Sequence, residues 1–76
     1  GPSRVDVYKM IMSLYLYYDE YEKAALIVEK YKNFLDSIDV DLDSSYYQMN
    51  SIIEYENCIS KTKDYFVIKN CIKEIE

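Results

Sequence analysis

The fold is decided by residues 20–38, which read EYEKAALIVEKYKNFLDSI. Apolar residues recur there at steps of three and four, the spacing of one face of an α-helix. Charged residues fill most of the remaining positions. The stretch therefore predicts an amphipathic helix whose apolar stripe faces a core. That stripe consists of Ala24, Ile27, Val28, Tyr31, Phe34, Leu35 and Ile38.

Three more helical segments are expected around it, at about residues 5–18, 45–59 and 64–75. The first is apolar nearly all round, which is typical of a helix covered on several sides. Only the polar stretch 18–20 separates it from the helix at 20–38, so one long continuous helix is an alternative. Ser45 and Gln48 have capping-box spacing and are expected to start the third helix.

The turns between these helices have to be made by polar residues, because glycine and proline are absent after residue 3. The clearest linker is residues 39–45, rich in aspartate and serine, and a shorter one is expected at 60–63. The first three residues, Gly1-Pro2-Ser3, are typical of a cleaved expression tag. We therefore expect a tag remnant at 1–3 and a single helical domain at 4–76.

The charge of the chain is acidic and unevenly placed. The net charge is −5, and residues 33–60 contain no lysine or arginine. Direct binding to nucleic acid is not expected, because affinity for phosphates depends on cationic side chains. The acidic residues either form a face in contact with solvent or attract a basic surface of another protein. They are Asp36, Asp39, Asp41, Asp43, Glu54 and Glu56.

Residues that carry catalysis or bind metals are scarce in this sequence. The chain has no histidine and no glycine-rich phosphate loop, so neither enzyme activity nor a cofactor is expected. Asp39, Asp41 and Asp43 resemble the start of a calcium loop, but Ser44 and Asn50 stand where that loop needs glycine and glutamate. No apolar run reaches the ~18 residues of a membrane-spanning helix. A cytoplasmic protein is therefore expected.

The two cysteines are expected to be reduced and mostly buried. Cys58 and Cys71 lie on either side of a turn placed at residues 61–62. Their distances from that turn offset them by roughly 9 Å along the hairpin at ~1.5 Å per residue. A disulfide tolerates at most ~7 Å between Cα atoms.

Tyrosine is unusually frequent, with ten residues in a chain of 76. Tyrosine suits half-buried positions and contact surfaces, because it combines a large apolar ring with a hydroxyl. Several tyrosines and methionines crowd the first helix, which three other helices cannot cover completely. We therefore expect a homodimer formed through this helix. The residues expected to self-associate are Tyr8, Met10, Met12, Tyr15 and Tyr17.

Residues 21–31, YEKAALIVEKY, resemble the second helix of a tetratricopeptide (TPR) repeat, and residues 63–72, KDYFVIKNCI, are similar. The second match follows 44 residues after the first, beyond the usual period of about 34 residues. Met12 and Glu56 stand where a small residue is expected, Ile68 replaces alanine, and the terminal proline is absent. The pattern is distantly like the repeat domains of Gram-positive peptide-sensing regulators. The resemblance implies a concave partner-binding surface formed by Lys9, Ser13, Tyr17, Asn50, Ile53 and Asn57.

Together these features predict an all-α fold of two antiparallel helical hairpins, either TPR-like or a small four-helix bundle. Ala24, Val28, Ile68 and Ile72 are expected to pack where the hairpins close. The expected function is a non-enzymatic interaction module that binds a protein or peptide through a tyrosine-rich helical surface. One alternative is a small acidic inhibitor of a nucleic-acid-binding enzyme, like the phage inhibitors of CRISPR effectors. The other is an oligomerisation domain.

Overall fold

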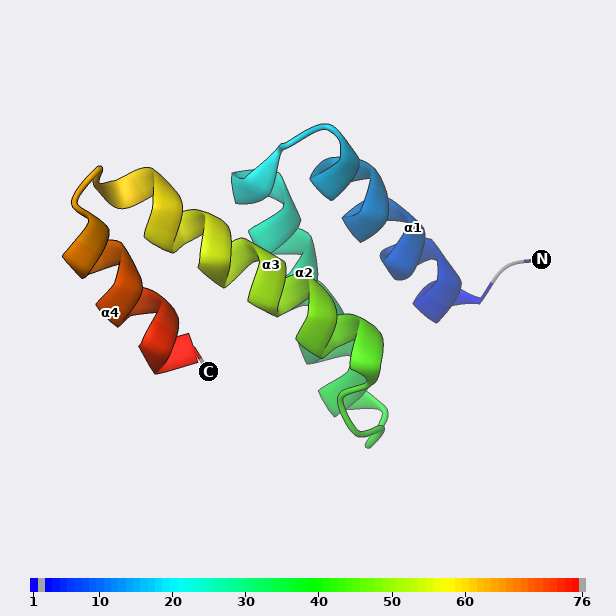
Figure 1. Cartoon of the computed structure of the whole chain (residues 1–76). Helices are drawn as coiled ribbons and strands as arrows, with labels where there is room; N and C mark the ends of the chain where they lie inside the picture. The colour runs from blue at the N-terminus through cyan, green and yellow to red at the C-terminus, as the bar shows by residue number, and fades with distance from the viewer. Residues whose placement is uncertain (2, 76) are drawn as a thin grey trace.

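The computed structural model describes residues 1 and 3–75, which form four helices joined by short turns (Figure 1). Successive helices run in opposite directions, so the all-α prediction of antiparallel helical hairpins is confirmed. No strand occurs in the described part of the chain. The helices are α1 (Arg4–Tyr17), α2 (Tyr21–Ser37), α3 (Ser44–Lys61) and α4 (Tyr65–Ile75).

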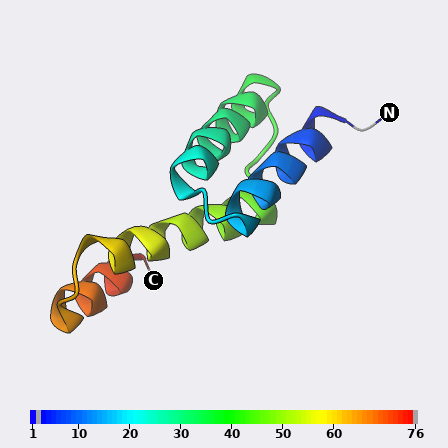
Figure 2. The same ribbon diagram turned by 90° about the horizontal axis from the view of Figure 1, so that it is seen from above.

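The four helices form an open row. Extensive contacts join only consecutive helices, α1 with α2, α2 with α3 and α3 with α4. The molecule is correspondingly elongated, measuring 46 × 26 × 15 Å. Figure 2 shows the α4 end extending away from the α1–α2 hairpin. Among the described residues, a helix at either end of the row therefore packs extensively against one neighbour only.

The first two turns use aspartate where many proteins use glycine. Asp19 and Asp39 follow α1 and α2 with φ of 58° and 55°. This left-handed conformation is tolerated by aspartate better than by most residues. In both turns the next residue donates a backbone hydrogen bond back into the helix, from Glu20 to Tyr15 (2.8 Å) and from Val40 to Leu35 (3.0 Å). The alternative of one continuous helix through residues 18–20 is therefore wrong.

The third helix begins two residues earlier than a cap at Ser45 would require. Its N-cap is Asp43, whose carboxylate accepts a hydrogen bond of 2.9 Å from the backbone N–H of Tyr46. The predicted capping box of Ser45 and Gln48 is therefore wrong. The negative charge of Asp43 also suits the positive end of the helix dipole, an advantage that serine lacks.

The core lies at the crossing of α1, α2 and α3. Ala24 and Val28 are buried as predicted, but Ile68 and Ile72 are only half-buried and do not join them. The reason is the open row, in which the described residues of α4 pack extensively only against α3. The prediction of a core closed by the fourth helix is therefore wrong. The buried cluster consists of Met12, Ala24, Val28, Tyr31, Leu35 and Ile53.

Tyr31 connects this core to the start of α3. Its side chain is completely buried, and its hydroxyl donates a hydrogen bond to the Asp43 carboxylate. Burial, and then the bond to Asp43, raise the pKa of the Tyr31 hydroxyl above its ordinary value. The Lys9 ammonium lies 3.5 Å from the same carboxylate. Asp43 thereby ties α1, α2 and α3 together.

Acid is expected to weaken this junction. Burial by itself would raise the pKa of Asp43, but the hydrogen bonds from Tyr31 and Tyr46, together with Lys9, outweigh burial and lower it. The unfolded chain therefore takes up a proton at Asp43 first as the pH falls. The stability contributed by Asp43 is complete above its ordinary pKa of 3.8 and is lost as the pH falls through the lower folded value.

Urea unfolding at a series of pH values tests this expectation. The free energy of unfolding of Asp43→Asn should fall less steeply below pH 4 than that of the unaltered chain. Asp41→Asn is the matched control, because Asp41 is exposed in the same linker, and it should keep the steep fall. Equal slopes for Asp43→Asn and the unaltered chain would contradict the role assigned to Asp43.

A disulfide joins Cys58 of α3 to Cys71 of α4, with the Cα atoms 5.7 Å apart. The prediction of two free thiols is therefore wrong. The error lies in the position of the turn, because α3 continues to Lys61 and α4 begins only at Tyr65. Cys58 thus lies three residues before the end of one helix and Cys71 six residues after the start of the next. The offset is about 4.5 Å, half of the expected value.

Candidate functional site

The first helix is apolar on two opposite sides. One side packs on the core and includes Val5, Tyr8, Tyr15 and Leu16 beside the buried Met12. The other side is open, because α2 is the only helix packed extensively against α1. We call this second side the α1 face. It comprises Val7 (36% exposed), Met10 (57%), Leu14 (50%) and Tyr17 (79%).

A shallow groove runs beside the α1 face, between α1 and α2. Its volume is about 370 Å³. Val7 belongs to both the groove and the α1 face, so the two form one continuous surface. Leu26, which precedes Ile27 on α2, is a further exposed apolar residue. This α1/α2 groove is lined by Arg4, Val7, Tyr8, Ile11, Ile27 and Lys30.

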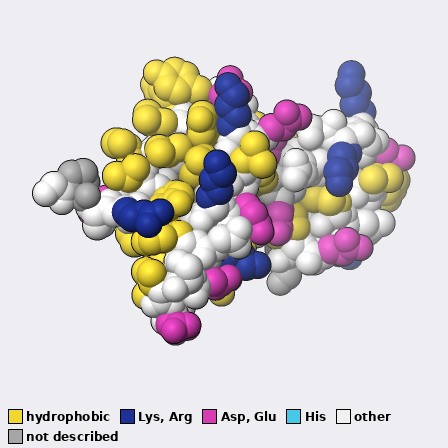
Figure 3. Space-filling view, turned by 180° about the vertical axis from the view of Figure 1, so that it is seen from behind, with side chains coloured by type: hydrophobic (Ala, Val, Ile, Leu, Met, Phe, Trp, Pro, Cys, Tyr) yellow, Lys and Arg dark blue, Asp and Glu magenta, His cyan; other side chains and the backbone are white. Residues whose placement is uncertain are grey.

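The charged residues that line the groove are both basic. The Arg4 guanidinium lies 4.4 Å from the centre of the Phe34 ring, a cation–π contact that holds it at the rim. Lys30 lies on the α2 side, and no described acidic residue lines the groove. Figure 3 shows hydrophobic side chains gathered over this end of the molecule, with lysine and arginine side chains among them. A surface with this character stands out in a chain of net charge −5.

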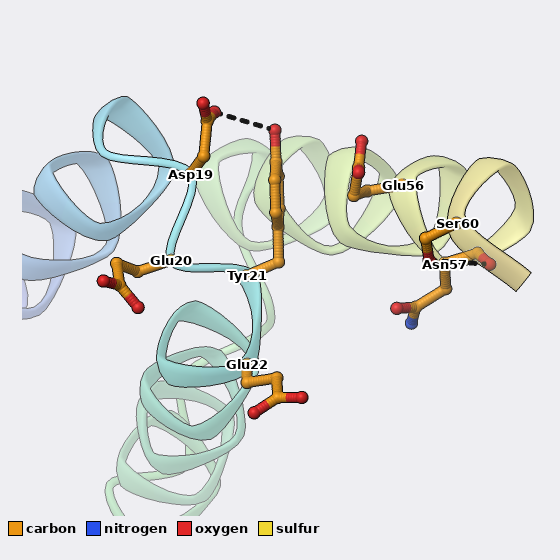
Figure 4. Close-up of a pocket in the computed structure, with 7 residues that line it drawn as sticks. All are labelled: Asp19, Glu20, Tyr21, Glu22, Glu56, Asn57 and Ser60. Carbon is orange, nitrogen blue, oxygen red and sulfur yellow. Dashed lines mark hydrogen bonds between the residues drawn. The ribbon is translucent and has the colours of Figure 1, made fainter.

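A second, polar pocket of about 350 Å³ lies between the α1–α2 turn and the second half of α3 (Figure 4). The Tyr21 hydroxyl donates a hydrogen bond of 3.1 Å to Asp19. That bond, and to a smaller extent desolvation, raise the pKa of the Tyr21 hydroxyl. Glu20 and Glu22 point away from this pair. The pocket is lined by Asp19, Glu20, Tyr21, Glu22, Glu56, Asn57 and Ser60.

Neither surface has the arrangement of a metal site. Within residues 1 and 3–75, no three histidine, cysteine, aspartate or glutamate side chains are grouped so that they could hold a metal ion. In the same part of the chain, no helix combines the length and hydropathy needed to cross a bilayer.

The residues predicted to form a concave partner surface do not form one continuous site. Ile53 is buried in the core, so the prediction that it contacts a partner is wrong for this conformation. Lys9 is half-buried beside Asp43, and Asn50 donates a hydrogen bond of 2.9 Å to Glu54. Asn57 lies in the polar pocket instead. The remaining two, Ser13 and Tyr17, are exposed on α1.

The residues predicted to self-associate divide between the two sides of α1. Met12 is completely buried, so its assignment to a dimer surface is wrong. Tyr8 and Tyr15 are half-buried against the core. Met10 and Tyr17 are well exposed and belong to the α1 face. The structure therefore leaves two of the five residues fully available to a partner.

Most of the predicted acidic residues remain on the surface. Asp36, Asp39, Asp41 and Glu54 are exposed, and Glu56 is half-buried beside the polar pocket. Asp43 differs, because its carboxylate is bonded to Tyr31 and Tyr46 and paired with Lys9. Asp43 therefore supports the fold and is not available to a partner.

Sequence reasoning missed the groove and did not identify which side of α1 faces the core. Val7, Ile11 and Leu14 have helical spacing, but other apolar residues surround them on the same helix. A helix that is apolar nearly all round does not reveal its buried side by periodicity. The basic residues of the rim, Arg4 and Lys30, lie on different helices, so only the packing of α1 on α2 brings them together.

Comparisons with models of known protein families, with curated proteins and with solved structures find no match to this chain.

Proposed function

We propose that the chain is a non-enzymatic protein-interaction module whose binding surface is the α1 face together with the α1/α2 groove. The observation that carries the proposal is the exposed apolar row of Val7, Met10, Leu14 and Tyr17 beside a groove whose described charged residues are both basic. Contiguous exposed apolar surface of this kind marks contact sites in soluble proteins. Aromatic residues and methionine are enriched in the centres of such contacts.

The chemistry of the surface favours a protein over a small ligand. The groove is shallow and continues into an open helix face, whereas small-molecule sites enclose most of the ligand. An apolar row at steps of three and four matches the side of another helix. Arg4 and Lys30 would add attraction to acidic residues beside the apolar residues of the partner.

Affinity capture with matched variants tests the proposal. The double variant Met10→Glu/Leu14→Glu places two charges in the α1 face and should reduce the captured partner at least tenfold, as quantified by mass spectrometry. The helix content should not change, because both side chains are exposed. The control is Tyr47→Glu/Val67→Glu, with two exposed apolar residues on α3 and α4 replaced. A partner captured equally well by all three proteins would place the binding surface elsewhere.

Ionic strength separates this function from that of an acidic inhibitor. Attraction between exposed charges is screened over about 8 Å at physiological salt. A partner held mainly by the apolar α1 face should therefore stay bound when the salt concentration is raised. A partner held by Asp36, Asp39 and Asp41 should dissociate.

A further inference from the structure

We infer that the protein seated on the α1 face is a second copy of this chain, whose α1 packs antiparallel to the first about a two-fold axis. This inference rests on the proposed function, and it names the partner. Four observations carry it: the spacing of the exposed residues, the register they allow, the charges at the two ends of α1, and the position of α1 in the row.

The spacing is that of a helix-pairing seam. Val7, Met10, Leu14 and Tyr17 are separated by three, four and three residues. This is the alternation with which paired helices repeat their contact positions. The row extends over nearly the whole of α1, so the contact can use the full length of the helix.

The row is self-complementary in an antiparallel register. Its midpoint is residue 12. A two-fold axis at that point places residues of the two copies opposite each other when their numbers add up to 24. Val7 then faces Tyr17 of the second copy, and Met10 faces Leu14. All four exposed residues are thus covered by the same four residues of the other copy. This mutual covering is what a two-fold interface requires.

The charges select the antiparallel direction. In this register the end of α1 that carries Arg4 lies beside the opposite end of the other copy's α1, where the acidic Asp19 and Glu20 follow the helix. Both acidic residues are exposed in the α1–α2 turn. A parallel arrangement would instead place Arg4 against Arg4. The helix dipoles also favour the antiparallel pair, because each positive end then lies beside a negative one.

The position of α1 explains why a second copy is needed. α1 ends the row, and α2 is the only helix packed extensively against it. Pairing two copies through α1 creates a layer in the order α2, α1, α1 and α2. Each α1 would then be covered on both of its apolar sides, in agreement with a helix that is apolar nearly all round.

Crosslinking with engineered cysteines tests the register. Met10→Cys and Leu14→Cys are made as separate variants, and each is oxidised mildly alone and in an equal mixture. The native cysteines are already joined to each other. In the inferred register, a cysteine at position 10 lies opposite position 14 of the other copy, whereas two cysteines at position 10 are displaced by about 6 Å along the helices. The mixture should therefore give at least five times more covalent dimer than either variant alone.

A charge exchange tests the direction independently. Arg4→Glu should weaken dimerisation at least tenfold in sedimentation equilibrium, and adding Glu20→Arg should restore most of the loss. Circular dichroism of each variant checks that the helices are intact. If each single variant alone forms as much covalent dimer as the mixture, the two helices pair in parallel and the inference is overturned. The inference is also overturned if the mixture crosslinks but Glu20→Arg does not restore the dimerisation that Arg4→Glu weakens.

The outcome for the unaltered chain separates this inference from the proposed function. Sedimentation at tens of micromolar should show a species of twice the 9.1 kDa chain mass. A strictly monomeric chain would overturn the inference. If Met10→Glu/Leu14→Glu still loses a captured foreign protein in that case, the α1 face remains the binding surface and its occupant is that protein.

Discussion

Tyr31→Ala is expected to destabilise the fold by about 3–5 kcal/mol, the range measured when large aromatic residues are removed from cores. Tyr31 is completely buried, and its ring centre lies 5.6 Å from that of Tyr8 on α1. The substitution also removes the hydroxyl that binds Asp43 at the start of α3. A chain of 76 residues has a total stability of about 4–11 kcal/mol. The variant should therefore lose a large share of its stability, which urea titration followed by circular dichroism would show as a much lower unfolding midpoint.

The matched control is Tyr47→Ala. Tyr47 is on α3 and is 57% exposed, so its loss should change the stability by about 0.5 kcal/mol or less. Tyr31→Phe separates the two roles of Tyr31, because it keeps the ring and removes only the hydroxyl. Its cost should be about 1.5–3 kcal/mol, the value of a hydrogen bond to a charged group. If Tyr31→Ala and Tyr47→Ala have equal effects, Tyr31 is not the centre of the core.

The sequence predicted the helices well because α2 has a clear one-sided pattern. The stripe from Ala24 to Leu35 contains all four residues that α2 buries completely, and the acidic turns stop the helices where glycine would otherwise be needed. Local chemistry was sufficient for these features. Both Asp19 and Asp39 adopt the left-handed conformation directly after a helix, so the turns depend on a property of individual residues.

The arrangement of the helices could not be predicted in the same way. Ile68 and Ile72 have the spacing of a core stripe, but the spacing does not say which helix they face. In the open row they face α3, so they do not reach Ala24 and Val28. The disulfide was missed for a related reason. A shift of the turn by one or two residues moves Cys58 and Cys71 by several ångströms relative to each other.

The candidate site shows the same limit. Met10 and Tyr17 were predicted to be exposed because a single small domain cannot cover an all-round apolar helix, and this argument needs only composition. The choice between the two apolar sides of α1 needs the position of α2. Met12 was placed on the wrong side for that reason, and Arg4 was not considered at all. Arg4 becomes part of the site only because Phe34 of α2 lies beneath its guanidinium.

Cys71→Ser is expected to unfold α4 while α1, α2 and α3 remain folded. None of the described residues of α4 is fully buried, and they pack extensively only against α3. With only 11 residues it is shorter than the ~12–15 residues that an isolated helix needs even in favourable sequences. The disulfide closes a loop of 13 residues, and a loop of this size contributes about 3 kcal/mol. Without that link, the half-buried Ile68, Ile72 and Ile75 are the main apolar residues that hold α4 in place.

Hydrogen exchange followed by mass spectrometry tests this expectation directly. In Cys71→Ser the amides of residues 65–75 should exchange at close to the rate of an unfolded peptide, whereas α2 should keep its protection because its core contacts are with α1 and α3. Reduction of the unaltered chain should produce the same pattern, and adding reductant to Cys71→Ser should change nothing further. The reductant control separates the loss of the covalent link from the effect of serine at position 71. If residues 65–75 stay protected in the variant, the packing of the three isoleucines is sufficient to hold α4, and the disulfide only reinforces a helix that is already bound.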